Sequence, residues 1–237
     1  MTTIDQLLDD VYGSDVKPAA RGATVTIERS YSITRVAAEY LYALVRSLKP
    51  HRTVEVGLAW GASSTAICAA LRDNANGARA TIMDPHQDLP GGAHTYHGVG
   101  LQALDRYGLR TVVDFHQERS DWVLAHLAHD GHRIQFAFID GDHRLDPTFV
   151  DFYFIDRMLD VGGVVIFDDF PFPAVQSVIA HVMGNLHYEA VPCPPTRLAA
   201  FRKAKADDRD FEQWYDHSRG PRAQEALDAL RNRQHLP

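Results

Sequence analysis

Residues 53–63 read TVEVGLAWGAS, an apolar strand pattern that runs directly into a glycine-containing turn. The turn carries Gly57 and Gly61, and an alanine-rich helical pattern continues from Ser63 to Leu71. Glycine lets a backbone turn tightly from strand to helix and approach a ligand closely. The free N–H groups of the following helix would then face polar or anionic ligand atoms. Taken alone, this stretch predicts a strand–helix turn that either binds a ligand or simply connects the two elements.

The same alternation of strand and helix continues outward from this turn. Strand patterns are expected at residues 53–56, 80–83, 111–115, 134–139 and 164–167, and helical patterns at residues 36–48, 63–71, 97–107, 122–127 and 147–159. Near-continuous apolar strands separated by helices are typical of a parallel sheet covered on both faces. The fold class is therefore expected to be α/β.

The chain is expected to have three parts. Residues 1–32 form a polar leader with one short helical pattern, and residues 33–204 carry the α/β alternation. Residues 205–237 form a charged tail with helical patterning around Trp214 and Leu227. At 237 residues with 45% hydrophobic content, this length suits one large domain with additions. The aromatic residues of the tail favour packing or a homodimer contact over an active-site role.

Composition excludes several function classes. A net charge of −7 without a basic stripe argues against nucleic-acid binding. The two cysteines, Cys68 and Cys193, are far apart and indicate neither a disulfide framework nor a zinc site. The N-terminus has no signal-peptide pattern, and no apolar run approaches the ~20 residues that span a bilayer. We therefore expect a cytoplasmic protein without membrane segments.

Carboxylates follow four successive expected strands. Asp84 follows the second strand, Glu118 the third, Asp140 and Asp142 the fourth, and Asp168 with Asp169 the fifth. Open α/β sheets bind ligands beyond the carboxyl ends of their strands. Aspartate is also a common turn former, so a single one would mean little. Four strand ends with carboxylates predict a functional edge of the sheet.

The nature of the ligand follows from two spacings. Asp84 lies some 20–25 residues beyond the glycine turn, where an acid that binds ribose hydroxyls belongs in such a fold. The spacing Gly57-x-Ala59-x-Gly61 differs from the dinucleotide fingerprint G-x-G-x-x-G. A ligand with a ribose is therefore expected, and an NAD-dependent oxidoreductase is a distant alternative.

These motifs resemble those of a known enzyme class. Glu55 to Ser63 resembles the E-x-G-x-x-x-G-x-S motif of class I S-adenosylmethionine-dependent O-methyltransferases, including the caffeoyl-CoA and catechol O-methyltransferases. Residues 139–143 together with Asp168 and Asp169 resemble the bacterial macrocin and aminocoumarin-sugar O-methyltransferase branch. The resemblance covers roughly residues 30–200. It implies a seven-stranded Rossmann-like sheet of order 3-2-1-4-5-7-6 with strand 7 antiparallel. The last two strands, with the helix that precedes them, would lie in residues 179–191 and 197–202.

The resemblance also implies cofactor contacts. Gly57, Ala59 and Gly61 would face the methionine part of S-adenosylmethionine, with Glu55 and Ser63 supporting its amino and carboxylate groups. Asp84 would accept hydrogen bonds from the ribose, a task that suits paired carboxylate oxygens. Arg119 and Ser120 would border the adenine, and Asp140 is counted among the cofactor contacts. One departure is visible, because Glu118 stands where relatives often have glycine.

Carboxylate oxygens of three aspartates at two strand ends predict a metal site. Asp140, Asp168 and Asp169 would hold Mg²⁺, which favours hard oxygen ligands. In the families that this chain resembles, the ion holds and acidifies the acceptor hydroxyl. Asp142 and His143 are the candidate general bases, of which histidine has the more suitable ordinary pKa. The alternative is that Asp168 and Asp169 form only a turn with one acid facing the cofactor.

The leading hypothesis is thus a Mg²⁺-assisted O-methyltransferase acting on a small hydroxylated molecule, such as a sugar or natural-product intermediate. Two alternatives stay open: a metal-independent N- or O-methyltransferase, and a non-catalytic module that binds a nucleoside ligand. The glycine-hinged loop between Asp84 and His97 is expected to act as a lid or to bind the acceptor. Its histidines His86, His94 and His97 lack zinc-ligand spacing.

Overall fold

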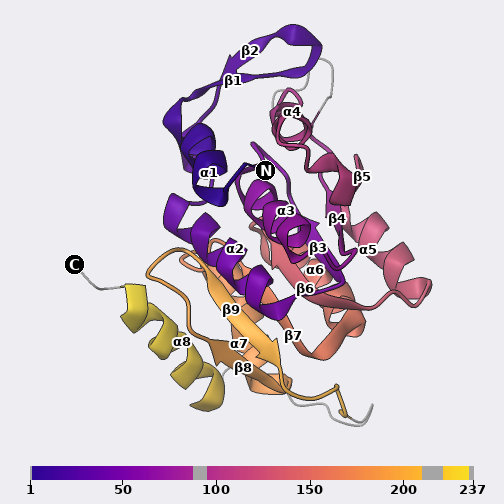
Figure 1. Cartoon of the computed structure of the whole chain (residues 1–237). Coiled ribbons are helices and arrows are strands. Elements are labelled where there is room, and N and C mark those ends of the chain that lie inside the picture. Colours follow the sequence, from indigo (N-terminus) through magenta and orange to yellow (C-terminus); the bar gives the residue numbers. More distant parts are fainter. Residues whose placement is uncertain (1, 88–94, 210–220, 235–237) are drawn as a thin grey trace. The chain divides into compact units, whose positions relative to one another are not determined.

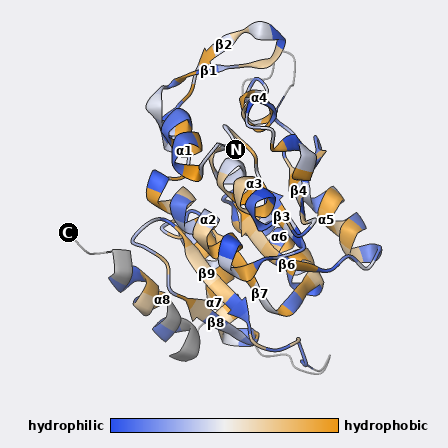
Figure 2. Ribbon diagram, viewed as in Figure 1, coloured by the Kyte–Doolittle hydropathy of each residue, from blue (hydrophilic) through white to orange (hydrophobic). Residues whose placement is uncertain are grey.

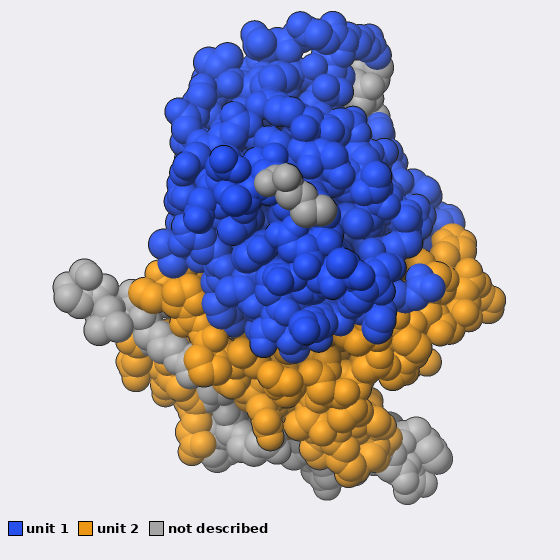
Figure 3. All heavy atoms as spheres, viewed as in Figure 1, with its two compact units in different colours: residues 1–123 blue, residues 124–237 orange. Residues whose placement is uncertain are grey.

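The computed structural model describes residues 2–87, 95–209 and 221–234 (Figure 1). The chain divides into two compact units, Met1–Val123 and Leu124–Pro237 (Figure 3). The boundary falls within helix α5 (Ser120–His129). The predicted helical patterning around Trp214 lies outside the described residues.

The strands form a seven-stranded sheet of order β5-β4-β3-β6-β7-β9-β8. Unit 1 contributes β3 (Arg52–Val56), β4 (Arg79–Met83) and β5 (Val113–His116). Unit 2 contributes β6 (Ile134–Ile139), β7 (Leu159–Phe167), β8 (Tyr188–Val191) and β9 (Ala199–Lys203). Within the units, β3 and β4, β4 and β5, and β6 and β7 pair in parallel, whereas β9 is antiparallel to β7 and β8. The predicted order and the antiparallel last strand are confirmed.

In unit 1 the helices are α1 (Ile4–Gly13), α2 (Arg35–Leu48), α3 (Ala62–Asn74), α4 (Val99–Arg106) and the first part of α5. The side chains of Thr3 and Thr34 cap the N-termini of α1 and α2 by accepting backbone hydrogen bonds. Both helices show hydrophobic and hydrophilic colours in Figure 2, as expected of helices with one buried face. In contrast, α3 is buried from Ala62 to Leu71 and packs against α2, so it forms the core of this unit.

In unit 2 the helices are the rest of α5, α6 (Leu145–Met158), α7 (Pro173–Asn185) and α8 (Pro221–Gln234). Helix α7 begins with Pro173, whose missing N–H costs nothing in the first turn. Helix α8 packs on α7 through the buried side chains of Leu227 and Leu230. No helix among the described residues is both long and apolar enough to cross a membrane.

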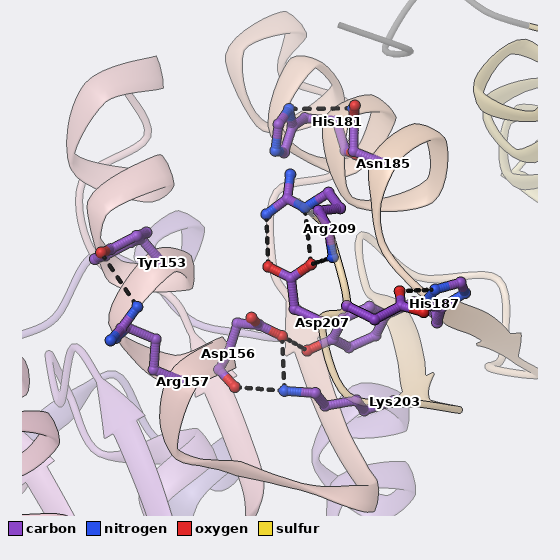
Figure 4. A network of polar contacts seen from close by, with 11 residues as sticks. Tyr153, Asp156, Arg157, His181, Asn185, His187, Lys203, Asp207 and Arg209 are labelled. Carbon is purple, nitrogen blue, oxygen red and sulfur yellow. Dashed lines mark hydrogen bonds and ion pairs between the residues drawn. The ribbon is translucent and has the colours of Figure 1, made fainter. Parts of the chain in front are cut away.

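A buried ion pair holds the β8–β9 edge of unit 2 (Figure 4). The Nζ of Lys203 lies 3.0 Å from Oδ1 of Asp156 and also donates to the Asp156 carbonyl at 2.6 Å. The hydroxyl of Tyr188 donates to the same carboxylate at 2.7 Å. The side chains of Lys203 and Asp156 are only 8% and 13% exposed, so their charges need these partners. The network ties α6 to the edge strand β8 and to its neighbour β9.

Three details of the fold differ from the sequence expectation. The leader contains, besides α1, an antiparallel pair of short strands, β1 (Val16–Pro18) and β2 (Thr24–Thr26), with 3₁₀ turns at Ala20–Gly22 and Arg29–Tyr31. Strands of three residues are too short to show a periodic pattern. Residues 110–112 form a 3₁₀ turn before β5, and residues 179–185 complete α7, so that only Tyr188–Val191 are strand.

Candidate functional site

The turn after β3 needs an unusual backbone. Gly57, Ala59 and Gly61 have positive φ angles of 92°, 43° and 86°. Glycine adopts this left-handed region at no cost, whereas alanine does so rarely. The N–H of Gly57 donates to the Met83 carbonyl at 2.9 Å, which prolongs the parallel pairing of β3 and β4 into the turn. The turn therefore projects its later backbone groups away from the sheet.

Gly61 is also required by packing. A Cβ on Gly61 would lie 2.9 Å from the Cα of Gly100, and a Cβ on Gly100 would lie 2.7 Å from Cγ of Leu58. Real Cβ atoms essentially never come this close to other heavy atoms, so the two glycines let α4 pack directly on the turn. The sequence predicts Gly61 from the tight strand-to-helix turn and from a close approach of ligand. Helix packing supplies a further, independent reason for this glycine.

Asp84 holds the turn from the end of β4. It is 3% exposed, and its Oδ2 accepts hydrogen bonds from the N–H groups of Leu58 and Ala59 at 3.1 and 2.8 Å. Nε2 of Gln87 donates to the same oxygen at 3.0 Å, and the N–H of His86 donates to Oδ1 at 2.7 Å. A carboxylate offers about four acceptor positions, so these donors take up most of its capacity. Asp84 thus positions the turn, in addition to its predicted role toward a ribose.

Glu55 and Ser63 contact each other. The Ser63 hydroxyl donates to Oε1 of Glu55 at 2.6 Å, and the Glu55 side chain is 1% exposed. This contact joins β3 to the first turn of α3. The N-terminus of α3 has Gly61 as its N-cap and no capping side chain. Its free N–H groups and the positive end of the helix dipole favour an anionic ligand group.

Arg119 and Ser120 lie where β5 leads into α5. The Arg119 guanidinium pairs with the Asp121 carboxylate through two contacts of 3.0 Å, and its side chain is 73% exposed. Of the predicted cofactor residues in unit 1, Arg119 is thus the one held at the surface.

In unit 2 the ends of β6 and β7 bring three aspartates together. Ile139 and Phe167 are register partners, so Asp140 and Asp168 follow adjacent strand ends. The N–H of Asp168 donates to the Ile139 carbonyl at 3.0 Å, which extends the pairing by one residue. Asp169 has a φ of 54°, a left-handed turn that aspartate tolerates better than most residues.

Two cations neutralise this aspartate group. Nε2 of His143 lies 2.6 Å from Oδ2 of Asp169 and 3.9 Å from Oδ1 of Asp140. Arg197, which precedes β9, places Nη2 3.1 Å from Asp168 and Nη1 3.2 Å from Asp169. The side chains of Asp168 and Asp169 are only 2% and 5% exposed. Because buried carboxylates are costly without partners, Arg197 and His143 are required for this arrangement.

The crowded charges shift the pKa values of the group. Burial raises the pKa of Asp168 to about 7, and Asp140 adds to this effect while Arg197 opposes it. Burial also raises the pKa of Asp140. The carboxylates of Asp140 and Asp169 raise the pKa of His143 to about 10, so this imidazole is positively charged near neutral pH in the arrangement described.

Asp142, the second candidate base, lies apart from these contacts. Its carboxylate accepts hydrogen bonds from the side chain and the N–H of Arg144, at 2.7 and 3.0 Å. These hydrogen bonds lower the pKa of Asp142, which leaves it a weak base. His143 is therefore the candidate that the structure brings into the aspartate group.

The part of the chain that carries these features matches a known family. Residues 54–170, which include the turn, Asp84 and the aspartate group, match a family described as a methyltransferase domain. Residues 54–170 thus form a methyltransferase domain, and the chain is a methyltransferase.

Curated relatives of this methyltransferase match part of the chain. Caffeoyl-CoA O-methyltransferase of Stellaria longipes is 24% identical over 140 residues, which cover 56% of this chain and 52% of the relative. Tricin synthase 1 of Oryza sativa subsp. japonica is 27% identical over 139 residues, which cover 56% of this chain and 50% of the relative. The match thus spans about half the length of these relatives.

Solved structures share the fold. An S-adenosylhomocysteine-bound methyltransferase of Podospora anserina, PaMTH1, superposes with a TM-score of 0.59 at 16% identity, covering 74% of this chain and 81% of that one. The O-methyltransferase TomG of Streptomyces achromogenes, in complex with S-adenosylmethionine, also gives a TM-score of 0.59 at 16% identity, with coverage of 74% and 82%. At these identities the likeness concerns the fold alone.

The aspartate group of this methyltransferase has a donor set that suits a divalent cation. One ligand atom each from Asp140, His143 and Asp169 lies within 4.8 Å of the others. Two carboxylates and an imidazole are ordinary ligands for such ions. This set contains His143, whereas the sequence predicts Asp168, which here pairs with Arg197.

Three further residues were not found from the sequence. Arg197 was considered only as part of a strand, because nothing local indicates which carboxylates it reaches. Gln87 is fully buried and donates to both Asp84 and the Ala59 carbonyl, at 3.0 and 2.9 Å. Phe172 exposes 44% of its surface with its ring 5.2 Å from that of His143. Each depends on long-range contacts that no short motif shows.

Proposed function

We propose that this chain transfers a methyl group from S-adenosylmethionine to a hydroxyl oxygen of a small molecule. The observation that carries the proposal is the methyltransferase-domain match over residues 54–170, which contains both the Asp84-braced turn and the aspartate group. The printed names of the curated relatives include O-methyltransferases. The solved structures of the same fold include complexes with S-adenosylmethionine and S-adenosylhomocysteine.

The turn of unit 1 is the proposed cofactor site. The free N–H groups of α3 would receive the carboxylate of the methionine part, because an uncapped helix N-terminus favours an anion. Asp84 would serve the ribose by exchanging part of its present hydrogen bonds for those of the hydroxyls. Glu55, paired with Ser63, would face the positively charged end of the cofactor.

The aspartate group of unit 2 is the proposed site of proton transfer. Methyl transfer forms a carbon–oxygen bond as the carbon–sulfur bond breaks, and the acceptor hydroxyl gives up its proton. Without a bound metal, His143 takes this proton after its imidazole has lost its own, which its raised pKa of about 10 delays to alkaline pH, and Asp169 orients the imidazole through the 2.6 Å contact. Arg197 keeps Asp168 and Asp169 in place. The exposed ring of Phe172 offers an apolar surface beside His143 for the body of the acceptor.

A divalent cation fits this proposal. Asp140, Asp169 and His143 would hold it, and we propose Mg²⁺ on the basis of the two carboxylates. Such an ion, when bound, supplies positive charge that favours the alkoxide form of an acceptor hydroxyl. The second candidate is transfer without metal. It is favoured by Arg197, whose positive charge already offsets Asp168 and Asp169.

The function is tested with the full chain, S-adenosylmethionine and a panel of catechols, sugars and phenolic acids. We expect S-adenosylhomocysteine to form only with an acceptor, and mass spectrometry to show the new methyl group on oxygen. Loss of activity in EDTA with recovery in Mg²⁺ supports the metal, whereas full activity in excess EDTA contradicts it. Binding of S-adenosylhomocysteine in calorimetry without turnover on any acceptor would instead indicate a non-catalytic module.

A further inference from the structure

A small cavity lies in unit 1 between the leader, α4 and the predicted cofactor turn. It holds about 20 Å³ of space, and its polar lining comes from Lys17, Arg29, Ser32, Trp60, Arg106 and Tyr107. A site for one water-sized group needs roughly 10–15 Å³, so this cavity suits a small polar head group rather than a whole ligand.

The cavity carries one positive charge more than its ion pairs offset. Arg29 pairs with Asp15 and Arg106 pairs with Asp10. Lys17, only 9% exposed, donates to the backbone carbonyl of Asp10 at 2.6 Å. An ammonium group has three N–H donors, and this carbonyl is the one partner that Lys17 has among the described residues. Burial accordingly lowers the pKa of Lys17. A buried, underused ammonium favours an anion beside it.

Two neutral hydrogen-bond donors of the cavity also lack an acceptor in the described part of the chain. Nε1 of Trp60 and Oγ of Ser32 are buried, and neither has a hydrogen-bond partner among the described residues. An indole N–H can only donate, so it needs an acceptor atom. Oδ2 of Asp10 accepts from Arg106 at 2.7 Å and from the Tyr107 hydroxyl, and no hydrogen bond joins Asp10 to Nε1 of Trp60 or Oγ of Ser32 among the described residues. The cavity therefore presents an unbalanced cation and two donors without an acceptor.

We propose that this cavity binds a carboxylate group of the methyl acceptor. A carboxylate has two oxygens, which matches the small volume, and it has only acceptor positions, which matches the donors of Lys17, Trp60 and Ser32. A phosphate group has five heavy atoms and needs more space than the three heavy atoms of a carboxylate. Calling the ligand the methyl acceptor rests on the proposed function, whereas the carboxylate site itself does not.

The cavity adjoins the turn through Trp60. This residue lies between Ala59 and Gly61 of the turn, and its side chain packs against the buried cluster of Ala19, Ile27 and Val99. Its ring also meets that of Tyr96 edge-on, at a centroid distance of 4.8 Å. A carboxylate held by the Trp60 N–H would therefore restrain the turn. We expect carboxylate and S-adenosylhomocysteine to increase each other's affinity, because such coupling is reciprocal.

The indole N–H signals of the three tryptophans in an ¹⁵N-labelled full chain report on the site directly. Trp60→Phe assigns the signal of Trp60. We expect acetate to shift this signal saturably and to leave the signals of Trp122 and Trp214 in place. Acetamide, which is neutral and of similar size, should not shift it, and phosphate should bind more weakly than acetate. An equal response to acetamide, or tighter binding of phosphate, overturns the carboxylate assignment.

Acetate binding to variants tests whether the residues of the cavity hold the carboxylate. Lys17→Met should weaken acetate binding at least tenfold, while the exposed control Lys49→Met should leave it unchanged. Because Lys17 is buried, Ser32→Ala provides a milder second variant with an expected weakening of several-fold. Acetate binding that is equal in Lys17→Met and the unaltered chain, with both folded, contradicts the proposal.

Methylation assays test whether the bound carboxylate belongs to the methyl acceptor. If the ligand is the acceptor, carboxylate-bearing acceptors should be methylated with a KM at least tenfold lower than their amide analogues, and Lys17→Met should remove this preference. Acetate binding in a chain that methylates no acceptor leaves the carboxylate site and overturns the proposed function. Methyl transfer with no carboxylate preference overturns the acceptor assignment alone.

Discussion

The strand-end carboxylates of the two units are stabilised in opposite ways. In unit 1, Asp84 is surrounded by neutral donors close to it in the fold: the backbone N–H groups of Leu58, Ala59 and His86, and the amide of Gln87. In unit 2, Asp168 and Asp169 face charged side chains instead, namely those of Arg197 and His143. Both groups are buried, so each needs its partners.

The difference bears on what each region can do. Backbone donors cannot swing away or change their charge, so they give Asp84 and its turn one geometry. Histidine can lose its proton, and long cationic side chains can exchange partners. The region around Asp84 is therefore suited to hold a cofactor of constant shape. The aspartate group is suited to a step in which a proton or a cation comes and goes.

The largest expected effect is that of Asp169→Asn on catalysis. This change removes one charge that faces both His143 and Arg197. We expect kcat to fall about 1,000-fold, since a positioned acid or base contributes roughly 10²–10⁴. Affinity for S-adenosylhomocysteine in calorimetry should stay within about twofold if the two regions act separately. A parallel loss of cofactor affinity would contradict the division of roles.

Asp84→Asn tests the opposite region. The new side chain would either point its NH₂ group at the N–H groups of the turn, which are also donors, or point its uncharged oxygen at them. In the second case the hydrogen bonds lose the negative charge that strengthens them. We expect affinity for S-adenosylhomocysteine to fall about 100-fold, because hydrogen bonds to charged groups contribute about 1.5–3 kcal/mol each. Asp114→Asn, at an exposed position of β5, is the matched control. Equal affinity in both variants would show that Asp84 is not needed.

The charge of His143 is the third test. Its pKa of about 10 should appear in an NMR titration of the imidazole in the presence of chelator, and Asp169→Asn should move it back toward 6.5. A raised pKa in the folded state stabilises the fold fully below the unfolded value, near 6.5, and this contribution is lost as pH rises through about 10. His143→Gln should remove that part of the pH dependence of unfolding. A titration midpoint near 6.5 would show that the carboxylates do not act on His143.

Gly61→Ala tests the rigid region through stability. The added Cβ would lie 2.9 Å from the Cα of Gly100, on a residue with a φ of 86°. We expect unfolding in urea to need about 1–3 kcal/mol less than for the unaltered chain, the usual cost of overpacking. Gly77→Ala is a matched control, since it also has a positive φ, of 73°, but no atom within 4 Å of the added Cβ. An equal loss in both variants would attribute the effect to backbone strain alone.

The smallest effect is expected for Arg119→Ala. This side chain is 73% exposed and pairs with Asp121 at the surface. Exposed ion pairs contribute about 0.2–1 kcal/mol, so affinity for S-adenosylhomocysteine should change less than about threefold. A larger loss would mean that Arg119 contacts the adenine, as the family resemblance implies.

Local patterns were sufficient for most of the sheet. The strand at residues 134–139 matches β6 in full, because a buried strand must be apolar along its length. The glycine turn and Asp84 could be recognised together because residues that end adjacent parallel strands meet at one edge. The short strands of the leader were missed, since Val16–Pro18 and Thr24–Thr26 are too short for any periodicity.

The sequence by itself determined the α/β class, the strand order through family resemblance, and which carboxylates end the strands. Only the tertiary structure showed which side chains stabilise those carboxylates, because Arg197 reaches Asp168 from 29 residues away and nothing local indicates that Gln87 donates to Asp84. It also showed that Asp142 pairs with Arg144, whereas His143 joins Asp169. The chemistry of a strand end depends on its nearest charges, and these are set by packing rather than by position along the chain.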